Sequence, residues 1–225
     1  MPIDPITFSA EALKIISNYD MQDHNFWKDE DLVGKVIRKE IRDHYMPLQE
    51  YRCAYCNNQN IEDHGLVWDC EHFLPKKGYP RFMFEPRNLV LSCKSCNLAK
   101  ERYKEELLFA EDKPEIYPEN AHDFKLIHPI FESYSDYFRI VSKNDCRLIE
   151  LQDNLTEKKK EKADFTFQCC NFKRFVAKFA GFDHYREDIL YSIQKLQESS
   201  GANTIDEIVE QLENPDVKIE RRLFD

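Results

Sequence analysis

Two pairs of cysteines with identical spacing are the residues of this chain best suited to chemistry. The pairs are Cys53-Ala-Tyr-Cys56 and Cys93-Lys-Ser-Cys96. Four thiolates complete the tetrahedral ligand set that a structural zinc ion prefers, and Cys-x-x-Cys pairs commonly supply them. The spacing therefore predicts one structural zinc site at Cys53, Cys56, Cys93 and Cys96. The alternative is an accidental spacing of core thiols.

A carboxylate and a histidine lie between the two pairs, in the segment Asp69-Cys-Glu71-His72-Phe-Leu-Pro75. In isolation a Glu-His dipeptide is typical of an exposed salt bridge. Between two zinc knuckles it is a candidate catalytic pair. Adjacent residues of a regular strand point to opposite faces, so Glu71 and His72 can share a site only where a strand ends or bends. Pro75 favours such an end.

The charge distribution is uneven. The chain has a net charge of -10, yet the window from His72 to Lys104 contains eight basic and two acidic residues, so this window carries +6 and the rest -16. A uniformly acidic surface repels a polyanion, whereas one basic window attracts phosphates to one place. A charge run is also typical of a solvated face, but this one coincides with the cysteine pairs and the histidine. We interpret it as a nucleic-acid-binding window.

Composition predicts a cytoplasmic protein with one main core. A chain of 225 residues that is 42% hydrophobic can bury at least one core. Its first residues lack the basic and apolar regions of a secretory signal, and no uninterrupted apolar run approaches the ~18 residues of a membrane span. In a reducing compartment cysteines are thiols or metal ligands, so the four outside the pairs are expected to be small apolar core residues: Cys70, Cys146, Cys169 and Cys170.

The elements around these residues follow from hydrophobic spacing. Apolar residues recur every three or four positions in the first fifty residues, which predicts helices up to Pro47: Phe8, Leu13, Ile16, Leu32, Val36, Ile37, Ile41 and Tyr45. The run 66–73 has strand character, a loop with Pro75 and Pro80 follows, and 88–92 is the expected partner strand. Helix-forming residues from Asn97 to Leu108 complete a strand-strand-helix unit.

The second half of the chain is expected to contain a hairpin and further helices. Strands are predicted at 138–141 and 147–151, with a turn at 143–145. The mixed tract 157–162 is expected to form an exposed turn or helix face. A phenylalanine stripe of helical period should face the core: Phe172, Phe175, Val176, Phe179 and Phe182. Asp183 and Thr204 have the positions of helix N-caps.

The order of motifs from Cys53 to Lys104 resembles the zinc-stapled branch of the HNH nucleases. It runs Cys-x-x-Cys, then Glu71-His-Phe-Leu-Pro-Lys76, then Asn88-Leu-Val-Leu-Ser-Cys93, then Cys96-Asn97 with Lys100. Within that family the pattern is most similar to the HNH subunits of Septu-type bacterial anti-phage systems. The resemblance covers less than a quarter of the chain. It implies metal-dependent hydrolysis of a nucleic-acid phosphodiester.

The resemblance also assigns roles to four residues. His72 is the general base, which suits an imidazole with an ordinary pKa near ~6.5 because it is mostly neutral at pH 7. Glu71 and Asn97 are ligands of a catalytic Mg²⁺ or Mn²⁺, and Asn88 positions the loop between the strands. Glu71 stands where the family more often has aspartate or histidine. Asn97 replaces the histidine of some members, which argues against a catalytic zinc.

The remaining assignments concern partners. The basic residues expected to bind DNA or RNA are Lys76, Lys77, Arg81, Lys94 and Lys100. The resemblance to Septu systems implies an ATPase partner that switches the activity on. The competing interpretation is a catalytically inactive zinc-ribbon module that binds nucleic acid or protein.

The sequence as a whole therefore predicts an α+β protein. A ββα-metal core with a structural zinc, at 51–110, is expected to be wrapped by a helical extension at 1–50 and by a hairpin and helical region at 111–225. No membrane association is expected.

Overall fold

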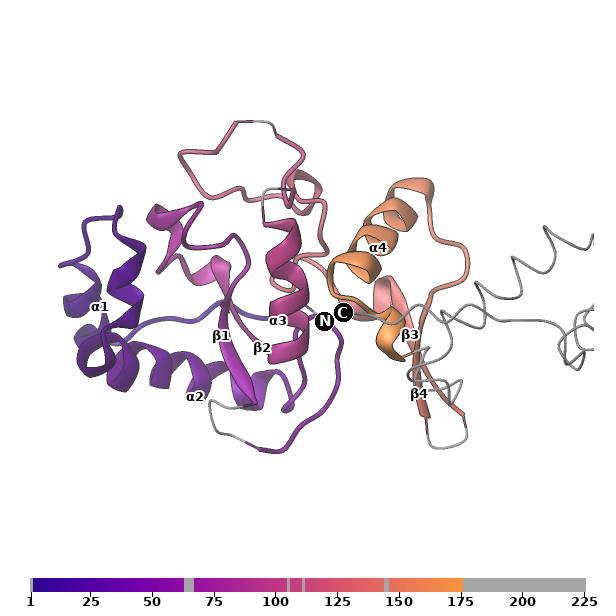
Figure 1. Ribbon diagram of the computed structural model, residues 1–225, viewed down its shortest axis with the longest axis horizontal. Coiled ribbons are helices and arrows are strands. Elements are labelled where there is room, and N and C mark those ends of the chain that lie inside the picture. Colours follow the sequence, from indigo (N-terminus) through magenta and orange to yellow (C-terminus); the bar gives the residue numbers. More distant parts are fainter. Residues whose placement is uncertain (1, 63–66, 105, 111, 144–145, 176–225) are drawn as a thin grey trace, which may run out of the picture. The chain divides into compact units, whose positions relative to one another are not determined.

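A computed structural model describes residues 2–62, 67–104, 106–110, 112–143 and 146–175 (Figure 1). Two compact units are present. The first contains Met1–Val141 and Ile149–Lys173, and it holds the strands β1 and β2, the paired cysteines and the residues around them. The second contains Ser142–Leu148 and Arg174–Asp225, and most of its residues lie outside the described ranges.

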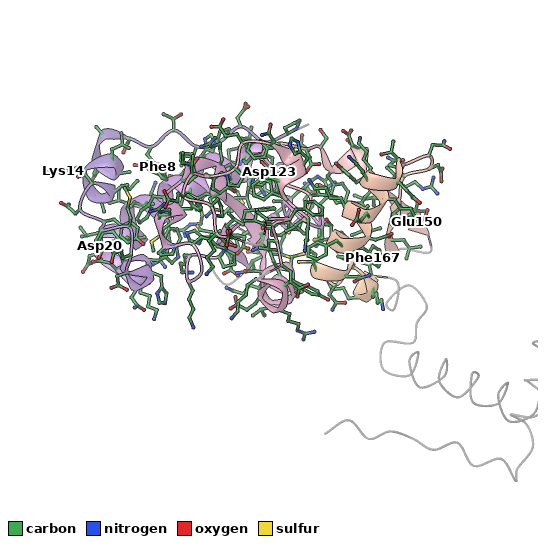
Figure 2. All side chains as sticks on the ribbon, turned by 90° about the horizontal axis from the view of Figure 1, so that it is seen from above. Phe8, Lys14, Asp20, Asp123, Glu150 and Phe167 are labelled. Atoms are coloured by element: carbon green, nitrogen blue, oxygen red, sulfur yellow. The ribbon has the colours of Figure 1, made fainter. Side chains whose placement is uncertain are left out.

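The N-terminal region is helical, as predicted. Helix α1 (Ala10–Ile16) begins at Ser9, whose hydroxyl accepts a hydrogen bond from the Ala12 backbone N–H. A 3₁₀ helix (His24–Lys28) follows, and a π-helix (Glu30–Ile37) runs directly into α2 (Arg38–Leu48). Phe8, two residues before α1 in the sequence, is buried, whereas Lys14 and Asp20 are exposed to solvent (Figure 2).

The buried face of these helices differs slightly from the predicted one. In α1 the buried residues are Ala12 and Ile15, one position before the predicted Leu13 and Ile16. Leu32 was also expected to face the core but is 43% exposed. The π-helix has i to i+5 hydrogen bonds, so it turns its side chains to a face that a 3.6-residue period does not predict. Its buried residues are Val33 and Ile37.

Two antiparallel strands form the centre of this unit. Strand β1 (Trp68–His72) pairs with β2 (Leu89–Cys93), in a register that sets Glu71 opposite Val90 and His72 opposite Leu89. These are the two strands predicted from the sequence. Consecutive β2 residues Leu89, Val90 and Leu91 are all buried, so both faces of the pair are covered. Helices α2 and α3 both contact the pair.

The helix after β2 is shorter than predicted. Helix α3 spans Lys94–Lys100 and continues as a 3₁₀ turn, Glu101–Tyr103, instead of extending from Asn97 to Leu108. Leu107 and Leu108 are buried, and Leu108 forms an isolated bridge with Phe124. This tertiary pairing outweighs the helix propensity of the sequence around them. Strand, strand and helix nevertheless follow one another as expected (Figure 1).

The segments after α3 form a hairpin and one long helix. Strands β3 (Phe138–Lys143) and β4 (Cys146–Leu151) pair, as predicted, while the turn at 144–145 lies outside the described residues. Helix α4 (Glu157–Cys169) begins at the Thr156 cap. Short 3₁₀ helices lie in the loops at Pro80–Phe82, Pro86–Asn88, Ala121–Asp123 and Tyr134–Asp136.

Two predictions for this region are modified. The tract 157–162 was expected to be exposed, but Lys162 is buried, and the Glu132 carboxylate 2.6 Å away compensates its charge. Phe172 of the predicted stripe is buried. The rest of the stripe beyond residue 175 and the helices expected at Asp183 and Thr204 lie outside the described residues.

The observed structure is mixed helix and small sheets, so the α+β class is confirmed. The three regions 1–50, 51–110 and 111–225 remain a prediction. In the part of the chain that is described, no helix combines the length and the apolar character needed to cross a membrane.

Candidate metal centre and catalytic site

The four paired cysteines converge on one point. Their Sγ atoms all lie within 4.8 Å of one another. A tetrahedron of sulfurs with Zn–S bonds of about 2.3 Å has edges of roughly 3.8 Å, and the Cys56 and Cys93 Sγ atoms are 3.9 Å apart. The site therefore fits the predicted zinc ion in ligand type, number and spacing.

Local backbone structure brings each pair into place. The first pair forms a tight turn, in which the Asn57 N–H donates to the Cys53 carbonyl (2.8 Å) and Asn57 adopts a left-handed φ of 54°. The Ala54 N–H donates to the Leu91 carbonyl (3.1 Å), which attaches this turn to β2. Cys93 is the last residue of β2 and Cys96 lies in α3. The metal site thus joins residues about forty positions apart.

The electrostatics of the cluster favour a bound cation. Hydrogen bonds from the other three thiols lower the pKa of Cys93, whereas burial raises the pKa of Cys53. The four thiols therefore do not all ionise together on their own, because several bare negative charges in one small volume repel one another. A divalent ion removes that repulsion and allows all four thiols to ionise. Of the other cysteines, Cys169 and Cys170 are buried and Cys70 is partly exposed.

Gln49 extends the small sheet with its side chain. Its amide nitrogen donates to the Leu91 carbonyl and its amide oxygen accepts from the Leu91 N–H, both at 2.9 Å. The side chain thus supplies both hydrogen bonds that a neighbouring strand would make. Gln49 follows directly after α2, so this pair fixes the end of α2 against β2.

One face of β1 carries a row of polar contacts with α3. Asp69 and Glu71 point to the same face because strand side chains alternate, and residues three apart on α3 lie on one side of that helix. The Lys94 ammonium lies 2.6 Å from Asp69, and the Asn97 amide donates to Asp69 at 2.9 Å. Lys100 lies 2.6 Å from Glu71. Three residues of α3 thereby fix its position along β1.

The ion pair between Glu71 and Lys100 is buried. Their side chains are 6% and 3% exposed, and the Lys100 ammonium also donates to the His72 carbonyl at 3.0 Å. Burial raises the pKa of Glu71, and the adjacent Lys100 opposes this shift. Lys100 was predicted to bind nucleic acid. In this structure the ammonium is enclosed and faces Glu71, and a role in nucleic-acid binding remains a prediction.

His72 is the last residue of β1, and its side chain contacts other partners than the Glu71 side chain does. Its Nε2 is 3.0 Å from the Met83 carbonyl and its ring packs edge-on against Trp27, with centroids 4.3 Å apart. A carbonyl can only accept, so Nε2 carries the proton and Nδ1 keeps its lone pair. Burial, reinforced by Lys76, lowers the pKa of His72 well below its usual value. The ring is therefore a neutral base at pH 7.

Asn88 holds the connection between the strands. Its side-chain oxygen accepts from the Leu74 N–H (2.6 Å), and its nitrogen donates to the carbonyls of Leu74 (3.1 Å) and Phe82 (2.9 Å). The residue is fully buried. All three bonds reach the loop that begins after His72, and one of them holds Phe82, the residue directly before Met83, whose carbonyl orients the imidazole.

The structure brings some of the predicted catalytic residues together and separates others. No hydrogen bond joins Glu71, His72 and Asn97 to one another in the described ranges, and their side chains bond to different partners. Lys100 links two of the residues, because it donates to the Glu71 carboxylate and to the His72 carbonyl. Among the described histidine, cysteine and acidic side chains, only the four cysteines form a group of three or more with metal-binding geometry. Glu71 and Asn97 offer the oxygen donors that Mg²⁺ prefers, but Glu71 Oε1 already accepts hydrogen bonds from Lys100 and Tyr55.

The other predicted nucleic-acid-binding residues lie nearer the surface. Lys77, Arg81 and Lys94 are exposed and Lys76 is partly buried. Lys94 is paired with Asp69, and Arg81 donates to the Glu115 carbonyl at 2.8 Å. Lys76 lies 5.9 Å from the centre of the Trp27 ring. The contribution of these four residues to nucleic-acid binding remains a prediction.

Several contacts were not anticipated from the sequence. The role of Asp69 could have been predicted, because residues two apart in a strand share a face and Asp69 lies two positions before Glu71 in a predicted strand. The role of Tyr55, whose hydroxyl donates to Glu71 at 3.4 Å, could not be predicted. The same is true of Gln49, Trp27 and the Met83 carbonyl, because their partners lie 11 to 45 residues away in the sequence.

His128 is a second buried histidine, outside the catalytic region. The Ile130 N–H donates to its Nδ1 at 3.2 Å, so its Nε2 carries the proton and lies 2.8 Å from the Tyr117 hydroxyl. Burial lowers the pKa of His128 well below its usual value, and Lys162 and Arg87 reinforce this shift. Protonating Nδ1 would also break the bond from Ile130.

His128 is therefore expected to make the protein less stable in acid. An unfolded histidine binds a proton below about pH 6.5, while the folded His128 does not, so unfolding takes up a proton and stability falls as the pH decreases. We expect His128→Gln to reduce the pH dependence of the unfolding free energy by up to about 1.4 kcal/mol per pH unit below pH 6.5. Urea denaturation between pH 5 and 7.5 measures it.

The control for this experiment is His122→Gln, because the His122 side chain is 81% exposed. Its pH dependence should match the wild type. Zinc-ligand protonation contributes equally to all three proteins, so it cancels in the comparison. Equal slopes for wild type and His128→Gln would contradict the prediction.

Comparison with known proteins finds partial relatives. The chain is 36% identical over 96 residues to the Septu protein PtuB of Bacillus thuringiensis, covering 43% of this chain and 34% of that protein. It is 32% identical over 76 residues to protein ea31 of Escherichia phage lambda, covering 29% of this chain and 24% of that protein. The aligned part thus spans about a third and a quarter of the lengths of these relatives. No protein-family model matches the chain.

The likeness to the Septu protein agrees with part of the resemblance noted in the sequence. It covers less than half of this chain. Assignment to the HNH family remains a prediction.

Proposed function

We propose that this chain is a metal-dependent nuclease with an HNH-type ββα site, which acts in bacterial anti-phage defence. Three features support this proposal. The first is the succession of β1, β2 and α3, with a four-cysteine cluster to which the end of β2 and the start of α3 contribute one pair. The second is the Asn88 clamp on the loop between the strands. The third is the similarity to a Septu protein over part of the chain.

The observation that carries the proposal is the state of His72. Phosphodiester hydrolysis needs a base that is unprotonated at neutral pH and held in one tautomer. The bond from Nε2 to the Met83 carbonyl (3.0 Å) and the lowered pKa meet both requirements. In the proposed reaction, His72 Nδ1 accepts the proton of the attacking water.

Other residues of this chain hold the base and the substrate. Asn88 keeps the Met83 carbonyl in position to orient the imidazole, and Trp27 limits rotation of the ring. Lys76 and Lys77 lie four and five positions after the histidine and supply positive charge for a phosphate backbone. Glu71 and Asn97 would hold a Mg²⁺ or Mn²⁺ ion, which stabilises negative charge on the phosphate and on the leaving oxygen.

The proposed partners are a nucleic acid and an ATPase. A Septu-type role implies that a partner ATPase controls the nuclease. The proposed zinc ion is structural: it ties the first cysteine turn to β2 and α3, and β1, which carries His72, pairs with β2.

A cleavage panel tests the function. We expect purified zinc-loaded protein with Mg²⁺ or Mn²⁺ to cut at least one of supercoiled plasmid, single-stranded DNA and transfer RNA, and EDTA to abolish the cutting. The assay should be repeated on the chain co-purified with proteins from its own operon, because a partner-controlled nuclease is silent alone. Absence of cleavage in both preparations would count against a nuclease.

The second candidate is a zinc module that binds nucleic acid or protein without cutting. The observation that favours it is the burial of both catalytic candidates, because Glu71 and His72 are 5% and 4% exposed. Zinc and nucleic-acid binding without cleavage in either preparation would support this function.

A further inference from the structure

We infer that Lys100 is a built-in counter-ion that occupies the place of the catalytic cation on Glu71, and that a divalent cation binds there only by displacing the Lys100 ammonium. This inference rests on the proposed function for the existence of a catalytic cation at Glu71. It goes further by naming the residue that controls entry of the cation.

The ammonium uses oxygen donors of the kind that a hard divalent cation takes. Lys100 Nζ lies 2.6 Å from Glu71 Oε1 and 3.0 Å from the His72 carbonyl oxygen. Carboxylate and backbone carbonyl oxygens are typical ligands of Mg²⁺, Mn²⁺ and Ca²⁺. The faces of the Tyr55 and Phe73 rings, each 6.0 Å from Nζ, complete an enclosure for a positive charge.

Charge balance makes the two cations alternatives. Glu71 is buried, so its carboxylate needs a nearby positive charge to stay ionised, and Lys100 provides one. Lys76 also acts on Glu71 and adds positive charge to the region. A lysine and a divalent ion on one carboxylate oxygen would bring three positive charges within a few ångströms. The ammonium must therefore leave when the ion binds.

The position of Lys100 allows this exchange. It is the last residue of α3, where the helix gives way to the 3₁₀ turn Glu101–Tyr103. Asn97, one turn earlier, is held by Asp69 rather than by Lys100. When the lysine swings out, the contacts of Lys94 and Asn97 with Asp69 still hold α3 on β1. The next residue, Glu101, is exposed, and its carboxylate lies 4.0 Å from the Lys104 ammonium, so a displaced Lys100 would enter solvent beside this pair.

Direct measurement of Mn²⁺ binding tests the inference. Zinc-loaded wild type and Lys100→Met are titrated with Mn²⁺, and free Mn²⁺ is followed by its electron paramagnetic resonance signal. Because Lys100→Met removes the competing ammonium, its dissociation constant for Mn²⁺ should be at least about tenfold lower than that of the wild type. The matched control is Lys94→Met, which removes the exposed ammonium on Asp69 from the same helix and should change the constant less than about twofold. Equal affinity of Lys100→Met and wild type, or no binding by either, would overturn the inference.

A second measurement on the wild type avoids dependence on the folding of a variant. Lysines are acetylated with an N-hydroxysuccinimide ester with and without Mn²⁺, and the modified peptides are quantified by mass spectrometry. Labelling of Lys100 should rise when Mn²⁺ is bound. Lys162 is the internal control, because it is also buried against a carboxylate, 2.6 Å from Glu132, and should stay protected. Unchanged Lys100 labelling at saturating Mn²⁺ would overturn the inference.

The two proposals fail in different ways. A protein that binds Mn²⁺ with release of Lys100 but cuts no nucleic acid would refute the nuclease and leave the exchange standing. A protein that cuts nucleic acid while Lys100 stays protected with Mn²⁺ bound would refute the exchange and leave the nuclease standing.

Discussion

Replacing Cys53 by serine is expected to release the zinc ion and to unfold the region built on β1, β2 and α3. Structural zinc contributes about 10–16 kcal/mol of binding free energy in small domains, which is comparable to the whole stability of a typical domain, about 5–15 kcal/mol. Cys53 is also fixed in the fold, because the Cys93 N–H donates to its sulfur at 3.3 Å. Serine is a poor zinc ligand and would leave three thiols around the site.

The measurement is zinc content by mass spectrometry together with far-ultraviolet circular dichroism on heating. Cys53 is a better target than Cys96, because Cys170 hydrogen-bonds to Cys96 and could take its place as a ligand. The matched control is Cys70→Ser, since Cys70 lies in β1 but its thiol donates to the Arg38 carbonyl at 3.6 Å instead of joining the cluster. This control should retain one zinc ion. Full zinc occupancy and an unchanged melting temperature in Cys53→Ser would show that the cluster is not a metal site.

Replacing His72 by alanine is expected to reduce nucleic-acid cleavage about 10²–10⁴-fold, the usual contribution of a positioned general base. The variant leaves Asn88, Glu71 and the cysteines in place. The measurement is the single-turnover rate on whichever labelled substrate the wild type cuts. The pH dependence of the wild type provides a second readout. Because the pKa of His72 is lowered, the base stays unprotonated and the rate should not fall until the pH is well below 6.5.

His44→Ala is the matched control. His44 makes the same type of hydrogen bond, from Nε2 to the Asp4 carbonyl at 3.0 Å, but lies in α2 and takes no part in the proposed reaction. Its cleavage rate should equal that of the wild type. Since truncating a buried ring leaves a cavity, zinc content and circular dichroism of His72→Ala must first match the wild type. An intact His72→Ala that cuts at the wild-type rate would remove His72 from the mechanism.

The antiparallel pair of β1 and β2 could be predicted because its signals are local. Leu89, Val90 and Leu91 form a run of strand-forming residues, and the prolines at 75 and 80 mark the loop before it. The cysteine site was predictable for the same reason, since each pair is four residues long. In α3, by contrast, the helix-forming residues continued beyond the true end of the helix. The burial of Leu107 and Leu108 elsewhere in the fold decided that end.

The candidate site was predictable in residue type but not in arrangement. The sequence indicated that Glu71 and His72 are adjacent and that a strand alternates its faces. It did not indicate that Glu71 would face Lys100 or that His72 would face Trp27 and Met83. Lys100 is the clearest example: in the sequence it belongs to a basic window, whereas in the fold it is enclosed beside a carboxylate.

The sequence by itself thus determined the two Cys-x-x-Cys motifs, the two central strands, and the presence of a histidine base and a glutamate between the two motifs. These depend on spacings of a few residues, which backbone geometry converts directly into structure. Only the tertiary structure decided that Asn88 holds the loop, that the Met83 carbonyl sets the histidine tautomer, and that Lys100 neutralises Glu71. These contacts join residues 11 to 29 positions apart. They form because a buried polar group must find a partner wherever the packed chain brings one within reach.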